Sequence, residues 1–288
     1  MTARELILDA ELRFSAADIV FGHGTENARD EAVFLVFHAL GFPFDAKGPL
    51  LDQELTEVQR TAVEAIVTER ISSRRPAAYL TNRMWFAGHE FYIDERVLVP
   101  RSPIAELIRA RFEPWLVSER IYRILEIGTG SGCIAIATAI AMPNAVLDAT
   151  ENSVAALEVA AINLKHYPQL GSRLRFIQAD LFPAEHTSYD LIIANPPYVP
   201  GDVAVSLPRE YQHEPIVALE AGADGLKYLR RIIQYAPDHL SPDGAIIVDV
   251  GEMADIVDHK FSSVSFTWVD LEYGGEGVGI AYRHDFCN

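Results

Sequence analysis

The chain has 288 residues, of which 49% are hydrophobic, 10% aromatic and 23% charged. This composition is typical of a folded globular protein and excludes disordered and collagen-like chains. At roughly 150 residues per domain, the length predicts about two domains. Aspartate and glutamate total 41 against 24 lysines and arginines, which gives a net charge of −17. Since phosphate backbones repel an acidic protein, this charge argues against a nucleic-acid substrate and favours basic partners.

Neither a membrane span nor a metal site is predicted. The longest apolar stretch, residues 133–142, is much shorter than the roughly 20 residues that a spanning helix needs. The charged N-terminus does not resemble a signal peptide, so we expect a cytoplasmic protein. Two cysteines, Cys133 and Cys287, are too few for a disulfide framework, and no His-Glu-x-x-His pattern is present.

The first 80 residues are predicted to form helices. Two segments begin with the spacing of a capping box, in which the N-cap residue and the residue three positions later bond to each other's backbone. Another apolar segment follows an asparagine N-cap and ends at Gly41, as helices commonly do. The residues at these helix starts are Thr2 with Glu5, Asn27, and Thr56 with Gln59.

Residues 84–99 predict a short β-hairpin. They are rich in aromatic and β-branched residues, and turn-forming pairs occur at 87–88 and 94–95. Directly after them, Ser102 and Pro103 are a favourable N-cap and first helical residue, which predicts a helix to about residue 112. We therefore expect the hairpin to link two domains.

The rest of the chain alternates predicted strands with predicted helices. Such alternation indicates a doubly wound α/β fold, in which helices cover both faces of a mostly parallel sheet. The last two strands, joined through glycines at 274–277, are expected to pair antiparallel. The predicted strands are 123–126, 145–150, 174–178, 191–194, 245–250, 266–270 and 278–282.

A glycine-rich segment follows the first of these strands and opens the next helix. Glycines at this place let the backbone approach a ligand at the carboxyl end of a strand, where open α/β sheets bind cofactors. The third glycine follows the second by two residues, rather than by the three typical of dinucleotide folds. This spacing favours S-adenosylmethionine, which has no phosphate, over NAD. The candidate cofactor-binding residues are Glu126, Gly128, Thr129, Gly130, Ser131 and Gly132.

Acidic residues end the next two strands. Glu151 is placed to accept hydrogen bonds from both ribose hydroxyls of a nucleoside. Asp148 is the competitor, but three residues earlier it would point to the opposite face of the strand. After the third strand, Asp180 offers a carboxylate to the adenine amino group and Leu181 an apolar cover for the ring. The simpler alternative is a tight turn of glycines followed by solvated strand ends.

The segment Asn195–Tyr198 follows the fourth strand and indicates the chemistry. Pro196 and Pro197 fix the backbone and withhold amide donors, so the Pro196 carbonyl can face outward as an acceptor. Together with the Asn195 side-chain oxygen it provides two acceptors for one planar NH2 group. Tyr198 supplies an aromatic face for stacking. Two accepted hydrogen bonds orient a conjugated nitrogen and raise its electron density, which suits methyl transfer to it.

In this order, the motifs resemble those of class I S-adenosylmethionine-dependent methyltransferases, specifically the HemK-like protein-glutamine N5-methyltransferases. The resemblance covers essentially the whole chain. Release-factor methylation is the alternative within this family, but release-factor relatives usually carry Arg-Pro-x-Thr-Glu where this chain has a different sequence at 101–106, which argues against that substrate. Four further segments resemble the branch that methylates a glutamine of the third protein of the large ribosomal subunit. They are residues 21–25, 79–82, 88–92 and 97–103.

The resemblance implies a doubly wound class I methyltransferase sheet with a small helical N-terminal domain. Residues 1–80 would recognise the substrate, 81–100 would form the β-hairpin linker, and 101–288 the methyltransferase domain. The cofactor would be S-adenosyl-L-methionine, which Asn195 would also contact, and the partner a basic ribosomal protein. Residues 211–215 also resemble the family and are expected near the substrate. The implied catalytic residues are Asn195, Pro196, Pro197 and Tyr198.

Two other functions are weighed against this one. An adenine-N6 methyltransferase acting on nucleic acid would present a similar conjugated amino group, but base flipping and phosphate contact require a positive groove. The candidate basic patch for such a groove contains Arg70, Arg74 and Arg75. The other alternative is a cofactor-binding assembly protein without turnover, against which the intact Asn195–Tyr198 motif argues.

Overall fold

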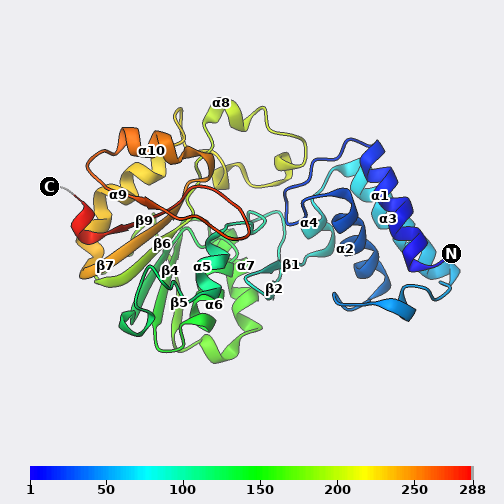
Figure 1. Ribbon diagram of the computed structural model, residues 1–288, viewed down its shortest axis with the longest axis horizontal. Coiled ribbons are helices and arrows are strands. Elements are labelled where there is room, and N and C mark those ends of the chain that lie inside the picture. Colours follow the sequence, from blue (N-terminus) through cyan, green and yellow to red (C-terminus); the bar gives the residue numbers. More distant parts are fainter. Residues whose placement is uncertain (287–288) are drawn as a thin grey trace.

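The N-terminal helices begin at the predicted caps in the computed structural model, which describes residues 1–286 (Figure 1). Helix α1 spans Ala3–Ala16 and α3 spans Glu57–Ser73, and each has a complete capping box at its start. Helix α2, Ala28–Leu40, begins after Asn27, whose side chain caps the first turn. It ends at Gly41 in the left-handed conformation, with φ 65°. These helix predictions are confirmed.

The N-terminal helices enclose a hydrophobic core of their own. Their buried residues, Phe14 and Leu35 among them, form a cluster separate from the two cores of the sheet. A short helix that the sequence did not predict, α4 (Ala77–Thr81), follows and crosses the expected boundary at residue 80. The Tyr79 hydroxyl of α4 donates a hydrogen bond to the Val97 carbonyl at 2.5 Å, which ties this domain to the linker.

The linker contains the predicted hairpin in a shortened form. Strands β1 (Met84–Phe86) and β2 (His89–Phe91) pair antiparallel around Ala87 and Gly88. These two turn residues have positive φ angles of 49° and 88°, as a two-residue hairpin turn requires. The second predicted turn, at 94–95, joins no strands, because the chain runs without a further strand from there to α5.

Helix α5 (Ile104–Arg109) is shorter than the predicted helix over 103–112. It begins one residue late, although the Ser102 hydroxyl still accepts a hydrogen bond from its first amide at 3.3 Å. It ends early because Arg111 and the fully buried Phe112 adopt positive φ angles of 54° and 64°, a backbone conformation that no α-helix contains.

All seven predicted strands are present, in one sheet with the order β5-β4-β3-β6-β7-β9-β8. The first five in this order are parallel, whereas β9 is antiparallel to both of its neighbours. The final pair is therefore antiparallel, as predicted. The strands are β3 (Arg123–Ile127), β4 (Val146–Glu151), β5 (Leu174–Gln178), β6 (Tyr189–Ala194), β7 (Leu240–Asp249), β8 (Thr267–Trp268) and β9 (Val278–Tyr282).

Helices cover both faces of this sheet (Figure 1). Alternate residues of β6 point to opposite faces. Leu191 and Ile193 belong to the core beneath α5, α6 and α7, whereas Ile192 and Ala194 belong to the core beneath α9 and α10. The doubly wound prediction is confirmed. The remaining helices are α6 (Cys133–Ala141), α7 (Val154–Lys165), α8 (Gly201–Ala204), α9 (Lys227–His239) and α10 (Ala254–Lys260).

The parallel strands bring four candidate segments to one edge of the sheet. The end of β3 is in register with the ends of β4 and β6, and β6 with β7. The glycine loop, Glu151, Asn195 and Asp249 therefore lie along the same edge. The strand order reverses between β3 and β6. Open α/β sheets bind ligands at such a reversal, so the fold places the candidate residues where a ligand is expected.

Within residues 1–286, no helix is both long and apolar enough to cross a membrane. The same residues contain no group of three or more histidine, cysteine, aspartate or glutamate side chains arranged to hold a metal ion. Cys133 is a buried free thiol. Cys287, the other cysteine considered in the sequence, lies outside the described residues.

Candidate active site

The glycine loop after β3 leaves open space above its backbone. Gly128, Gly130 and Gly132 have positive φ angles of 76°, 55° and 79°. A Cβ atom added at Gly128 or Gly130 would meet no atom within 4 Å, whereas one at Gly132 would lie 2.9 Å from the Phe176 ring. The first two glycines therefore offer bare backbone to a ligand, and the third lets α6 pack closely against β5.

Glu151 contacts this loop directly. One of its carboxylate oxygens accepts a hydrogen bond from the Gly130 amide at 3.0 Å, and the other accepts from the Ser153 amide at 2.8 Å. Asp148 is used elsewhere, because Arg175 and the Tyr189 hydroxyl donate to it at 2.7 Å and 2.9 Å. Each Glu151 oxygen has a lone pair left for a ligand hydroxyl.

Glu126 is buried at the base of the loop, where it lines a small cavity together with Thr129 and Ser131. The residue is 2% exposed, and the Thr129 hydroxyl donates a hydrogen bond to its carboxylate at 2.5 Å. Burial raises the pKa of Glu126 to about 8, although this hydrogen bond opposes the rise. Thr129 and Ser131 are also buried. Glu126 and Thr129 therefore brace the loop.

Asp180 and Leu181, predicted to bind adenine, follow β5. The Asp180 carboxylate accepts two hydrogen bonds from Arg231 of α9, both at 3.0 Å. This pair is exposed, and exposed pairs contribute about 1 kcal/mol or less, so a ligand can displace Arg231. Leu181 has a positive φ of 71°, and its carbonyl accepts from the Thr150 hydroxyl at 2.5 Å. The hydrogen bond from Thr150 thus fixes the backbone of this turn.

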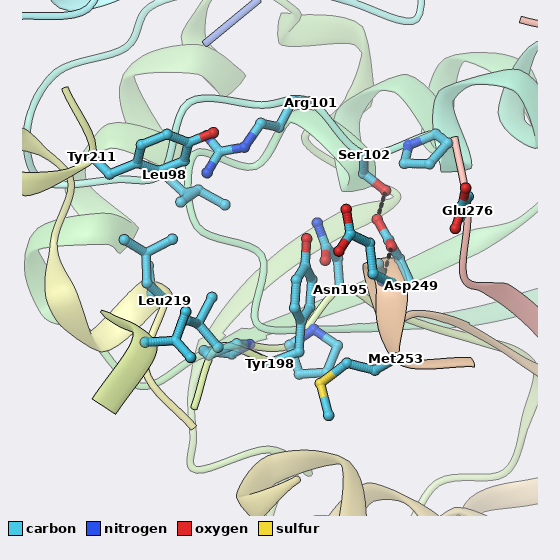
Figure 2. A pocket seen from close by; sticks show the side chains of 18 of the residues that line it. Leu98, Arg101, Ser102, Asn195, Tyr198, Tyr211, Leu219, Asp249, Met253 and Glu276 are labelled. Atoms are coloured by element: carbon cyan, nitrogen blue, oxygen red, sulfur yellow. Dashed lines mark hydrogen bonds between the residues drawn. The ribbon is translucent and has the colours of Figure 1, made fainter. Parts of the chain in front are cut away.

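The segment after β6 lines a cavity of about 510 Å³ (Figure 2). Asn195 and Tyr198 project toward it beside Asp249, which ends β7. The Tyr198 ring packs against Gly251 so closely that an added Cβ there would lie 2.9 Å away. Burial and the nearby Asp249 charge raise the pKa of Tyr198 to about 12. Tyr198 therefore presents a neutral phenol to the cavity at ordinary pH.

A smaller cavity of about 60 Å³ adjoins this one beneath the glycine loop. It holds a small group only, since a whole cofactor site measures several hundred cubic ångströms. The rest of a nucleoside cofactor would follow the open strand ends past Gly130 to Glu151. Four residues line both cavities, and so mark where a donor and an acceptor would meet. They are Leu98, Arg101, Ser102 and Asn195.

Two acidic residues line or support the larger cavity through contacts that the sequence did not predict. Asp249 accepts hydrogen bonds from the Ser102 hydroxyl at 2.7 Å and the Gly251 amide at 3.1 Å. The sequence feature that could have revealed Asp249 is its position at the end of a predicted strand. Glu214 binds Arg101 at 2.6 Å and 2.9 Å, across 113 residues of chain, and no sequence pattern indicated that pair.

Glu214 is a buried charged carboxylate. Burial by itself would raise its pKa, but contacts from His23 and Arg101 outweigh burial and lower the pKa to about 2. Tyr211, three residues earlier, lines the larger cavity. The expectation that residues 211–215 lie near a substrate site therefore agrees with their position, and no metal-binding group includes them among the described residues.

The candidate basic patch does not form a positive surface. Arg70 is fully buried, and its side chain donates to Glu31 at 2.6 Å. Arg74 is bound to Glu210 at 3.3 Å and to two backbone carbonyls. Arg75 is paired with a glutamate as well. Each of these arginines is paired with a glutamate, so the basic patch considered as an alternative does not form.

Comparison with known proteins agrees with this arrangement. The family model described as the methyltransferase small domain matches residues 114–209. The hMettl16 catalytic domain, solved in complex with the MAT2A 3'UTR hairpin 6, superposes with a TM-score of 0.52 at 15% identity, covering 78% of this chain and 80% of that one. The chain thus contains a methyltransferase domain and has a class I methyltransferase fold.

Proteins of similar sequence show to which family of methyltransferases the chain belongs. The ribosomal protein uL3 glutamine methyltransferase of Neisseria gonorrhoeae is 43% identical over 277 residues, 96% of this chain and 92% of that protein. The protein of the same name from Bordetella pertussis is 44% identical over 284 residues, 98% of this chain and 95% of that protein. The chain belongs to the family of ribosomal protein uL3 glutamine methyltransferases.

Proposed function

We propose that this protein transfers a methyl group from S-adenosylmethionine to the side-chain amide nitrogen of a glutamine in ribosomal protein uL3. One observation carries the proposal: Asn195 stands where the cavity beneath the glycine loop meets the larger cavity. An amide held by Asn195 faces the place where a methyl donor would end. The nearly full-length similarity to uL3 glutamine methyltransferases supports the same reaction.

S-adenosylmethionine supplies an electrophilic methyl group on a sulfonium centre. The open backbone at Gly128 and Gly130 would hold its amino-acid part, and the free lone pairs of Glu151 would accept the ribose hydroxyls. Asp180 would take the adenine amino group, and Leu181 would cover the ring. These residues fit the cofactor because they combine bare backbone, a charged acceptor and apolar surface along one edge of the sheet.

The residues of the Asn195–Tyr198 segment act on the amide itself. The Asn195 side-chain oxygen and the Pro196 carbonyl accept one hydrogen bond each from the amide NH2 group, which orients its nitrogen and increases its electron density. Pro197 fixes the backbone between them and Tyr198. The neutral Tyr198 ring packs against the amide plane. As the new bond from nitrogen to the methyl carbon forms, the bond from that carbon to the sulfonium sulfur would break, which leaves a neutral thioether, and the amide nitrogen would lose one proton to water.

The acidic charge fits a basic ribosomal protein. With a net charge of −17, the enzyme attracts a basic protein before contact and repels nucleic acid. Once the ribosome is assembled, ribosomal RNA would enclose such a substrate. We therefore propose that the free protein or an early assembly intermediate is methylated, in the cytoplasm where ribosomal proteins are made.

The alternatives are weaker on specific grounds. Methylation of adenine in nucleic acid requires cationic side chains near the site, and Arg70 and Arg74 are bound within the protein instead. A release factor is disfavoured because the relatives reported above are named for uL3. Loss of turnover is disfavoured because Asn195 and Tyr198 both face the cavity.

The test compares initial methylation rates with four acceptors in one buffer. They are free uL3, intact large ribosomal subunits, a release factor and adenine-containing DNA. We expect rapid labelling of free uL3 and little labelling of the other three, with a rate on uL3 that falls as salt screens the charges. Faster labelling of the release factor would assign the protein to that substrate, and labelling of DNA alone would overturn the proposal.

A further inference from the structure

One wall of the larger cavity comes from outside the sheet. Figure 2 shows Arg101 and Tyr211 across the cavity from Asp249. Arg101 belongs to the segment that follows the hairpin linker, and Tyr211 belongs to the connection between α8 and α9. That connection, residues 205–226, contains only single-turn helices at Tyr211–His213 and Ile216–Ala218. Contacts with other parts of the chain must therefore fix the position of Tyr211.

Glu214 provides the first of these contacts. Its carboxylate accepts hydrogen bonds from the Val99 amide at 2.9 Å and from both terminal nitrogens of Arg101 at 2.6 Å and 2.9 Å. The Glu214 side chain is fully buried. A bidentate pair of this kind fixes the plane of the guanidinium, which a single charged contact would not do.

His23 extends the contact into the helical domain. Its Nε2 atom lies 3.5 Å from the Glu214 carboxylate, and both side chains are buried. The imidazole also packs against the Tyr211 ring, with centroids 4.3 Å apart, while the Arg101 guanidinium lies 5.4 Å from the same ring centroid. Tyr211 is thus held at once by a residue of the helical domain and by a residue of the segment that follows the linker.

A second buried carboxylate anchors the same turn. Glu210 is 2% exposed and accepts hydrogen bonds from the Val20 amide and from Arg74, each at 3.3 Å. His213 bonds to the Ser73 carbonyl at 2.9 Å. The turn that carries Tyr211 is therefore attached to the helical domain on both sides, and this domain forms part of the support of the cavity wall.

We infer that Glu214 is a positioning residue for methyl transfer. It holds Arg101 and Tyr211 in place, and its contact with His23 connects this wall of the substrate cavity to the helical domain. Burying a charged pair costs free energy that an apolar contact would not cost. We therefore explain the buried pair of Glu214 with Arg101 by the orientation that it gives to the Arg101 guanidinium. The inference deepens the proposed function and rests on it, because it takes the larger cavity to be the place of the glutamine.

The test uses two single variants of the full-length enzyme, Glu214→Gln and His23→Ala. Glu214→Gln keeps the size of the side chain but loses the charge and the bidentate pair. We expect kcat/KM for uL3 to fall about 10- to 100-fold in each folded variant, because a residue that contacts the substrate is slightly misplaced. The KM for uL3 should change more than the dissociation constant of S-adenosylmethionine. Amide hydrogen exchange over 207–215 should become faster in both.

The matched control is Glu64→Gln, which removes an exposed pair with Arg13 within the helical domain. It should leave kinetics and exchange unchanged. If both test variants keep the kcat/KM of the parent, per folded molecule, Glu214 is structural only and the inference is wrong. Hydrogen exchange needs no substrate. A parent enzyme that fails to label uL3 while exchange still rises in the variants would therefore refute the proposed function and leave the coupling intact.

Discussion

The Ser102 hydroxyl donates a hydrogen bond to a carboxylate oxygen of Asp249 at 2.7 Å, across 147 residues of chain. Ser102 follows the linker and lines both cavities, whereas Asp249 ends β7 and lines the larger one. Burial raises the pKa of Asp249, and hydrogen bonds from Ser102 and the Gly251 amide oppose that rise. This bond therefore joins the segment after the linker to the sheet at the place proposed for methyl transfer.

Removing the hydroxyl should destabilise the protein. Ser102→Ala leaves the buried Asp249 without one of its two hydrogen-bond donors, which should cost about 1.5 to 3 kcal/mol of unfolding free energy. Urea denaturation followed by circular dichroism measures it. The control is Ser206→Ala, whose exposed hydroxyl donates only to the Val203 carbonyl. Equal losses of unfolding free energy in the two variants would show that the Ser102 hydrogen bond stabilises the protein no more than an exposed one.

Replacing Glu151 should weaken the binding of the cofactor. Glu151→Ala removes a charged acceptor at the open side of the glycine loop, so the dissociation constant of S-adenosylmethionine should rise by a factor that corresponds to about 1.5 to 3 kcal/mol. Calorimetric titration measures it. Asp148→Asn is the matched control, because Asp148 lies on the same strand but binds Arg175 and Tyr189. Unchanged affinity in Glu151→Ala would make this residue a brace of the loop alone.

Replacing Asn195 should separate chemistry from binding. Asn195→Ala removes one acceptor from the reacting amide and leaves the glycine loop intact. Turnover should therefore fall about 100-fold or more, as for the loss of one positioned group, while cofactor affinity changes little. Single-turnover kinetics and calorimetric titration on the same preparation provide both values. Parental turnover would rule out the role proposed for this side chain.

Glu126 should make the protein less stable as pH rises. Its pKa is about 8 in the folded chain against 4.5 for an ordinary glutamate, so the folded state retains a proton that the unfolded state releases. The stability from this proton is fully present below about pH 4.5 and is lost as pH rises through about 8. Glu126→Gln stays neutral, and so should gain stability relative to the parent toward about pH 8. Urea denaturation across this range checks it, and a difference independent of pH would contradict it.

Much of the fold could be predicted because its signals are local. The capping boxes at Thr2 and Thr56 and the stop at Gly41 depend on neighbouring residues, and the helices begin and end there. The predicted helix to residue 112 failed because the burial of Phe112 at a positive φ is set by the core around it. Helix α4 was missed because its five residues are too few to show a periodic pattern.

The candidate site divides in the same way. The glycine loop, Glu151 and Asn195 were found because each directly follows a predicted strand, and parallel strands bring such residues to one edge. The pair of Arg101 with Glu214 depends on how two distant loops meet, so no spacing in the chain could reveal it. The same is true of Arg70, which the sequence presents as a surface cation and the fold buries against Glu31.

The most direct test of the central claim is the position of the methyl group on uL3 after reaction with the purified enzyme and S-adenosylmethionine. Tandem mass spectrometry of the digested protein locates it, with Asn195→Ala as the control enzyme. We expect a single methyl group on the side-chain amide of one glutamine, absent with the control. A methyl group on lysine, on another type of side chain, or on none at all would contradict it.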